Sequence, residues 1–230
     1  MRRISHDTYS LVFGVAYLGL MTNAMLALAC LPLLLLLILT DPADTWLLLA
    51  GLSPLAAPAI VAAFTVFRRY SDDGSTDVVR GFWRGWVATA RRSLVLGAAG
   101  AALLTVLILD IRVLSTTSYA ALIIPLLAAS TLLVLGLLPI VLTAVAEAPG
   151  ARLRDVVVIS AVLGVRRWYL TLGSLVILGS LGTFFILKPA LALGLACGPL
   201  LYAVWANARY TLKPAIVDEG PAEADPVVAQ

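Results

Sequence analysis

Side chains that could carry out catalysis or bind a metal are few in this chain. Its 230 residues include one histidine, His6, and two cysteines, Cys30 and Cys197. Metal sites and acid–base pairs need several such groups at fixed spacing, and the sequence has no GxSxG elbow, Gly-rich phosphate loop or aspartate pair inside an apolar run. We therefore expect no enzyme activity and no cofactor or metal site. His6 is expected at the membrane interface and the cysteines at helix contacts.

Arginine and aromatic side chains gather in the string DVVRGFWRGWVATARR, residues 77–92. At helical spacing, Val78, Phe82 and Trp86 share one face, with Trp83 beside them and arginines opposite. A helix of this kind lies in the membrane interface instead of crossing it. Two roles stay open, a topological anchor and a docking surface for a partner or for anionic lipids. The candidate docking or lipid surface comprises Arg80, Phe82, Trp83, Arg84, Trp86, Arg91, Arg92, Arg166 and Arg167.

A second candidate site consists of polar and proline residues inside apolar runs. The amide of Asn23 needs a hydrogen-bond partner, which is either another helix or a polar solute. Pro54, Pro58 and Pro139 free backbone carbonyls, which line cavities in some membrane proteins. These four residues form the candidate cavity of a small-solute permease, with ordinary helix packing as the alternative. The same runs hold no acidic, basic or histidine side chain, which disfavours ion-coupled transport.

The elements that must position these residues are apolar helices. The chain is 61% hydrophobic with a mean hydropathy of +1.01, which is typical of a membrane protein. A bilayer core about 30 Å thick requires about 20 apolar residues per helix. We predict an all-α membrane protein with one transmembrane domain at 1–213 and a disordered acidic cytoplasmic tail at 214–230. The six predicted spans are residues 13–39, 45–67, 93–112, 119–145, 168–187 and 189–208.

The distribution of positive charge predicts the orientation of the chain. Of the sixteen Lys and Arg residues, only Arg112 and Lys188 lie outside the termini and the second and fourth loops. Because positively charged loops resist translocation, we expect both termini in the cytoplasm of a bacterial plasma membrane. The pI near 9.1 then reflects topology and attraction to anionic lipids, not nucleic-acid binding.

Two segments of the chain share a layout. DVV at Asp77 and RRSLVLG at Arg91 match DVV at Asp155 and RRWYLTLG at Arg166. Each block follows a proline-containing span and leads into the next span, so the sequence predicts two cytoplasmic interfacial helices within two parallel hairpin repeats. The alternative is convergence, since cytoplasmic hairpins commonly acquire arginines beside apolar residues.

Three strings together resemble the YesL-like bacterial membrane proteins, a family of unknown function (domain of unknown function 624). They are LSPLAAPAIVAAFTVFRRY from Leu52, GFWRGW from Gly81 and ARLRDVVVISAVLGVRRWYLTL from Ala151, and the resemblance covers roughly residues 8–210. It implies an accessory role beside a carbohydrate ABC importer, whose permease or ATPase subunits would be partners, and it transfers no site residues. We therefore predict a membrane accessory or interaction protein, also able to self-associate, with the permease as the alternative.

Overall fold

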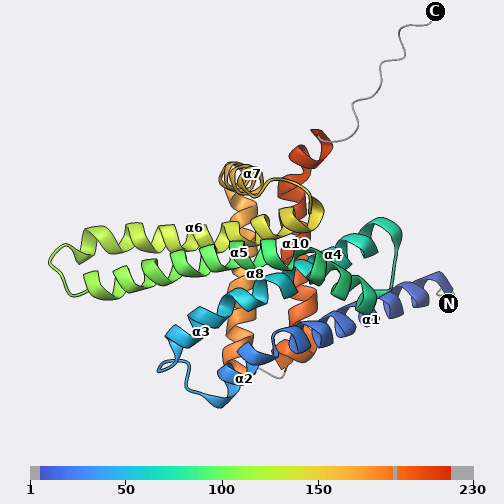
Figure 1. Ribbon diagram of the computed structural model, residues 1–230, viewed down its shortest axis with the longest axis horizontal. Helices are drawn as coiled ribbons and strands as arrows, with labels where there is room; N and C mark the ends of the chain where they lie inside the picture. Colours follow the sequence, from blue (N-terminus) through green and yellow to red (C-terminus); the bar gives the residue numbers. More distant parts are fainter. Residues whose placement is uncertain (1–5, 189–190, 219–230) are drawn as a thin grey trace, which may run out of the picture.

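The protein is described by a computed structural model that covers residues 6–188 and 191–218, with side chains described for 14–188 and 191–215. Every regular element in these residues is helical, which confirms the predicted all-α class (Figure 1). In chain order the elements are α1 (His6–Ala29), α2 (Leu31–Leu39), α3 (Trp46–Leu52), the 3-10 turn η1 (Ser53–Leu55), α4 (Ala56–Asp73), α5 (Val78–Leu114), α6 (Ala120–Glu147), α7 (Leu153–Arg166), α8 (Trp168–Leu187), the π-helical η2 (Ala192–Ala196) and α10 (Cys197–Asp218).

Four of these helical stretches are long and apolar enough to cross a membrane: Trp46–Asp73, Val78–Leu114, Ala120–Glu147 and Trp168–Leu187. The bent pair Gly14–Ala29 and Leu31–Leu39 makes a fifth if it is counted as one span. The structure is thus compatible with a multi-pass membrane protein, and its described residues give four or five candidate spans where six were predicted.

The predicted sixth span, residues 189–208, does not meet the same criteria in the part of it that the structure describes. It starts as the π-helical η2 and continues as α10 to Asp218, past Arg209 and Lys213. Because α10 begins only at Cys197, it includes these two cations, which lower its mean hydropathy. The helix also runs beyond Pro214 into the predicted tail, whose last residues, 219–230, lie outside the described residues.

The predicted first span, 13–39, is broken. Its two helices, α1 and α2, meet at Cys30 with a bend of 76°. Pro32, in the first turn of α2, supplies the physical reason, because its ring has no N–H and clashes with the carbonyl four residues earlier. A proline also marks the second span, where Pro54 lies in the 3-10 turn η1 between α3 and α4, although that stretch stays one span.

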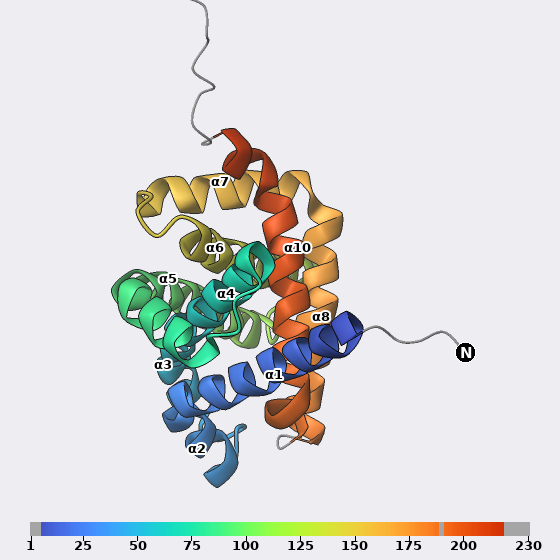
Figure 2. The ribbon, with the colours of Figure 1, turned by 90° about the vertical axis from the view of Figure 1, so that its right-hand side faces the viewer.

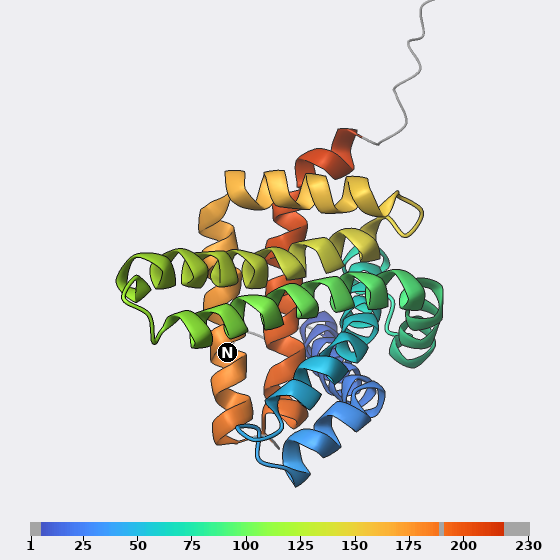
Figure 3. The ribbon, with the colours of Figure 1, turned by 60° about the vertical axis from the view of Figure 1, so that its left-hand side comes forward.

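The first predicted interfacial helix is not a separate element. Residues 78–92 and the predicted third span form the single helix α5, whose 37 residues extend about 55 Å at 1.5 Å per residue. The predicted break at Arg92 is therefore wrong. The second segment predicted to be interfacial is, by contrast, a separate helix, α7, which runs across the ends of α8 and α10 (Figure 3).

Helix α4 lies at the centre of the fold. It packs against α5 and α6 on one side and against α1 and α10 on the other (Figure 2). The core forms where these helices meet, with Phe64, Phe67, Ile140 and Trp205 all fully or almost fully buried. The α5–α6 hairpin crosses the α8–α10 pair, and its tip around Tyr119 projects away from the core (Figures 1 and 3).

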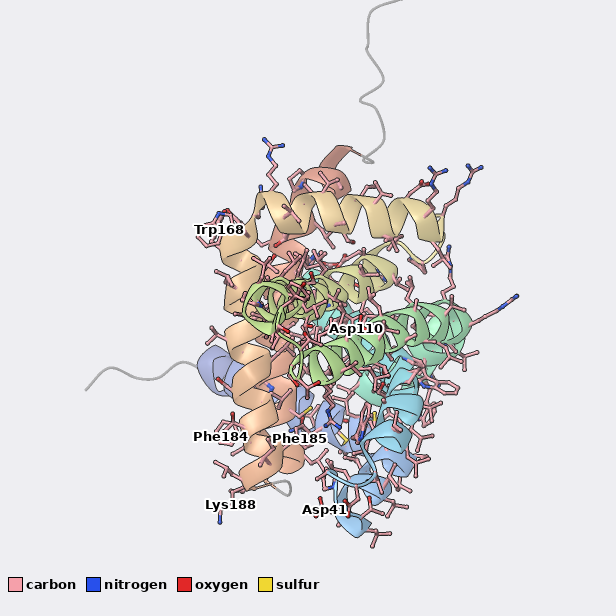
Figure 4. All side chains as sticks on the ribbon, turned by 90° about the vertical axis from the view of Figure 1, so that its left-hand side faces the viewer. Asp41, Asp110, Trp168, Phe184, Phe185 and Lys188 are labelled. Atoms are coloured by element: carbon pink, nitrogen blue, oxygen red, sulfur yellow. The ribbon has the colours of Figure 1, made fainter. Side chains whose placement is uncertain are left out.

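The two ends of α8 differ in their side chains. Trp168 lies at the α7 end, and Phe184, Phe185 and Lys188 lie at the other, near Asp41 (Figure 4). Aromatic residues at both ends of an apolar helix are typical of a membrane span. Asp110, on the projecting hairpin, lies between the two ends and not beside Lys188 and Asp41, because the hairpin crosses α8 (Figure 4).

Candidate functional site

A polar junction, formed by Arg68, Asp72, Glu147, Trp205 and Arg209, joins the ends of α4 and α6 to α10. Arg209 donates a hydrogen bond to the Asp72 carboxylate over 2.7 Å, and its Nε lies 3.4 Å from Glu147 Oε1. The same guanidinium lies 5.2 Å from the centroid of the Trp205 ring, within the range of a cation–π contact. Arg209 also donates to the Ser71 hydroxyl over 3.3 Å, so this one arginine of α10 contacts four other side chains.

Arg68 completes the junction through the backbone. Its Nη1 donates to the carbonyl oxygens of Ala146 and Glu147 over 2.6 and 2.8 Å. These carbonyls belong to the last turn of α6, where no further helical N–H is present to pair with them. The side chain of Glu147 is only 8% exposed, so its charge is held beside Arg209 away from bulk water. The junction therefore ties three helices together.

The arginine pairs Arg91–Arg92 and Arg166–Arg167 make similar contacts. In each pair the first member, Arg91 or Arg166, is exposed. The second donates to a distant backbone carbonyl: Arg92 bonds the oxygen of Ala151, and Arg167 bonds that of Tyr210 over 2.7 Å. Arg167 also lies 5.3 Å from the Tyr210 ring centroid. We call Arg92 and Arg167 clasps, because each holds its own helix to another segment of the chain through a hydrogen bond. Only the first arginine of each pair has an exposed side chain that could contact a partner.

The predicted docking surface is only partly exposed. Phe82 is fully buried against α4 and cannot contact a partner, and Trp86 is half-buried. Trp83 remains exposed and stacks edge-on against both rings, with centroids 5.9 Å from Phe82 and 5.8 Å from Trp86. Arg80 and Arg84 are exposed beside it. The α5 outer face, as we call the exposed set, consists of Val79, Arg80, Trp83, Arg84, Val87 and Arg91.

Asn23, the first residue of the predicted cavity, joins two helices. It is 3% exposed, its Nδ2 donates to the Gly194 carbonyl over 3.0 Å, and its Oδ1 accepts from the Gly198 N–H. These backbone groups belong to the π-helical η2 and the start of α10, where the regular helical pairing is disturbed. A Cβ on Gly198 would lie 2.8 Å from Asn23 Oδ1 and 2.9 Å from the Gly19 carbonyl. Gly198 thus allows α1 and α10 to pack closely within the chain, whereas a Cβ on Gly194, the other glycine of the GxxxG pair, would meet no atom within 4 Å.

The three prolines of the predicted cavity do not meet around a shared space. Pro58 and Pro139 are buried, and the Pro54 carbonyl faces Gly97 of α5, where an added Cβ would lie 3.3 Å away. The described part of the chain contains cavities of 410, 290, 210 and 170 Å³. None of these four is lined by Asn23 or by any of the three prolines.

Two of the cavities adjoin one another on α10. The basic cavity, of 410 Å³, is lined by Ser71 of α4 and by Tyr202, Trp205, Arg209, Tyr210 and Lys213. The apolar cavity, of 210 Å³, lies between α1, α4 and α10 and shares Tyr202 with it. Neither was predicted from the sequence.

Several residues of the polar junction were also missed. Asp72, Glu147 and Arg209 lie outside the six predicted spans, and none of them was a candidate in the sequence analysis. A usable signal was present, because Arg68 with Asp72 and Trp205 with Arg209 are each four residues apart and so share a helix face.

The two cysteines lie in the core or against it. Cys197 belongs to the buried core, and Cys30 packs against that core, as expected for apolar filling. Within residues 6–188 and 191–218, no three His, Cys, Asp or Glu side chains come together in a way that could hold a metal ion.

No family model, curated protein or solved structure matches the chain.

Proposed function

We propose that the protein is a non-catalytic accessory subunit of the bacterial plasma membrane, which binds a membrane transporter through the α5 outer face. The resemblance to the YesL-like proteins makes the permease or ATPase subunit of a carbohydrate ABC importer the partner to test first. In this proposal α10 is the sixth span, and both termini lie in the cytoplasm, as the positive charge of the second and fourth loops predicts.

The observation that supports the proposal most is that some arginines form contacts within the chain, whereas others are exposed beside a tryptophan. Arg68, Arg92, Arg167 and Arg209 each bond another element of the chain. Within the described residues, no such hydrogen bond or ion pair engages Arg80, Arg84 or Arg91, which flank the exposed Trp83. Tryptophan and arginine are the residues most enriched at the energetic centres of protein interfaces. Their exposure together on one helix face therefore supports docking.

Two further observations agree with this proposal. The second arginine of each pair clasps a later backbone segment in the same way, which supports the proposed duplication of the 77–97 and 155–173 segments. The polar groups that motivated a permease are engaged elsewhere: both polar atoms of Asn23 bond to backbone. We consequently favour the accessory role.

The test is crosslinked co-purification in mild detergent with mass spectrometry of the captured chains. The wild type should enrich importer permease or ATPase subunits, and the double variant Trp83→Ala/Arg84→Ala should lose them. Both side chains are exposed, so the variant is expected to fold. Tyr119→Ala is the matched control, because Tyr119 is 72% exposed but lies at the tip of the hairpin.

Equal enrichment by the wild type and the double variant, at equal protein levels, would contradict docking through the α5 outer face. If the purified protein alone transported a solute into liposomes, the permease would be the better proposal. Dependence of that uptake on an ATPase would instead favour the accessory role.

A further inference from the structure

The two cavities on α10 meet at Tyr202, and their linings differ in polarity. In the basic cavity, Lys213 and Arg209 are accompanied by the hydroxyl-bearing Ser71 and Tyr210. In the apolar cavity, the lining comes from Val15, Leu18 and Gly19 of α1, Phe67 of α4 and Pro199 of α10. Helix α10 lies between α4 and α8, and α1 crosses its lower half (Figure 2). The surface of α10 therefore passes from basic to apolar along its length.

The length of this surface matches one leaflet of a bilayer. Pro199 and Lys213 are about four helical turns apart, or about 21 Å at 1.5 Å per residue. A bilayer with its headgroups is about 40–45 Å thick, so one leaflet is roughly half of that. The basic cavity includes Arg209 and Lys213, toward the C-terminal end of α10, where α10 contacts α7, and α7 carries the exposed arginines Arg154 and Arg166.

The basic cavity has the chemistry of a phosphate-headgroup site. Lys213 is exposed, and Arg209 is held in place by Asp72 and Glu147 with part of its guanidinium still accessible. Arg167 adds a third cation against the ring of Tyr210. Arginine and lysine bind phosphate oxygens through charge-assisted hydrogen bonds, and tyrosine and tryptophan favour the headgroup level of a membrane.

We propose that these two cavities together bind one anionic phospholipid. Its phosphate lies between Lys213 and Arg209, its glycerol lies against Tyr202, and an acyl chain enters the apolar cavity between α1 and α10. A soluble phosphate compound would fill the basic cavity but would leave the adjoining apolar one without an occupant, which is why the lipid is favoured. The site is separate from the α5 outer face, because α4 lies between α5 and α10 (Figure 2).

The experiment measures the apparent Tm of the full chain, purified in detergent, during titration with short-chain phosphatidylglycerol, short-chain phosphatidylcholine or inorganic phosphate. Phosphatidylglycerol should raise the Tm at lower concentration than either other compound. Lys213→Gln should weaken that response about fivefold, the effect of one cation near an anionic surface. Lys188→Gln makes the same charge change at the far end of α8 and should leave the response unaltered.

The apolar cavity is tested by filling it. Gly19 lines this cavity, and a Cβ added to it meets no atom within 4 Å, so Gly19→Leu is expected to fill the cavity and to abolish the response to phosphatidylglycerol. If that variant does not fold, Val15→Trp fills the same space from a position that is 49% exposed.

Three results would overturn the proposal. Equal responses to phosphatidylglycerol and phosphatidylcholine would exclude recognition of the anionic headgroup. A response to inorganic phosphate as strong as that to phosphatidylglycerol, and unchanged by Gly19→Leu, would identify a soluble anion as the ligand. An undiminished lipid response in Lys213→Gln would exclude the basic cavity. The Trp83→Ala/Arg84→Ala variant should keep the lipid response, so a failure of partner docking is distinguishable from a failure of lipid binding.

Discussion

The segments that begin at Asp77 and at Asp155 share the strings DVV and RR but fold differently. The first runs through its arginine pair without a break, as part of the continuous helix α5. The second is divided into α7 and α8 at Arg167, whose φ of −109° and ψ of 46° are not helical. The comparison teaches that the neighbours of the two segments, more than the shared strings, decide whether the helix continues.

In the first segment, small residues at every fourth position allow α4 to pack along α5. They are Gly81, Gly85, Thr89, Ser93 and Gly97, and all are buried. The hydroxyl of Thr89 donates to the Gly85 carbonyl over 2.8 Å, and that of Ser93 donates to the Thr89 carbonyl over 2.7 Å. The hydroxyl groups are therefore hydrogen-bonded within α5 itself. These five small residues, which we call the small-residue stripe, let α4 approach α5 closely.

In the second segment, the position after the arginine pair holds Trp168 instead of a small serine, and Trp168 is 63% exposed. The bend at Arg167 leaves the Gly164 carbonyl without its usual partner four residues on. Thr171 of α8 supplies the missing donor, with its Oγ1 2.8 Å from the Gly164 oxygen. The bend is thus stabilised by one side chain that the first segment lacks.

The largest expected loss of stability comes from a substitution in the small-residue stripe of α5. In Gly97→Ala, the added methyl would lie 2.5 Å from the Cβ of Ala57 and 3.3 Å from the Pro54 carbonyl. Neither neighbour can rotate away, so α4 and α5 must separate, and we expect a loss of about 2–3 kcal/mol in the free energy of unfolding. Denaturation in mixed micelles measures it. Gly179→Ala on α8 is the control, because its Cβ meets no atom within 4 Å, and equal losses in the two variants would contradict the stripe.

The next effect concerns the clasps at the arginine pairs. Arg92→Gln and Arg167→Gln each remove a charged donor from a backbone carbonyl, and the loss of unfolding free energy should be about 1.5–2 kcal/mol for the partly buried bond of Arg92 and about 1 kcal/mol for the exposed bond of Arg167. The exposed partners supply the controls, since Arg91→Gln and Arg166→Gln should change stability by less than about 0.5 kcal/mol. Indistinguishable stabilities within either pair would show that the second arginine is not a clasp.

A smaller effect is expected at the glycine of the second segment. The added methyl of Gly164→Ala would meet Leu137 Cδ2 and Ile140 Cδ1, which are the flexible ends of side chains. Because these ends can rotate, we expect a loss of about 1 kcal/mol, clearly less than for Gly97→Ala. The same mixed-micelle denaturation compares the two. A loss at Gly164 as large as that at Gly97 would mean that the second segment is packed as rigidly as the first.

Much of the helical framework could be predicted from the sequence, because charge-free runs fix where apolar helices lie. The predicted spans 119–145 and 168–187 agree closely with α6 and α8. The continuity of α5 was missed because Arg91 and Arg92 were interpreted as the boundary between an interfacial helix and the third span, 93–112. The continuity of α5 depends on α4, which packs against the small-residue stripe from Gly81 to Gly97. The sequence of α5 alone does not show which helix packs against it.

The candidate site was less predictable for a related reason. Phe82 was correctly placed on the apolar face of its helix, but only the fold shows that this face is covered by α4. The polar junction likewise joins residues that are far apart in the sequence, such as Asp72 and Arg209. The helical spacing of four residues within α4 and within α10 indicated the faces involved, but not that these faces meet.

The smallest expected effect tests the bend directly. Thr171→Val keeps the shape of the side chain and removes the hydroxyl that bonds the Gly164 carbonyl, so the free energy of unfolding should fall by about 0.6–1 kcal/mol. Thr105→Val is the control in α5, where Thr105 Oγ1 donates over 2.7 Å to the Ala101 carbonyl inside an unbroken helix. That carbonyl has a backbone partner as well, so its loss of the hydroxyl should cost less. If both valine variants were equally stable, the Thr171 hydroxyl would not be what stabilises the bend, and the conformation of Arg167 would have to follow from its clasp to Tyr210 instead.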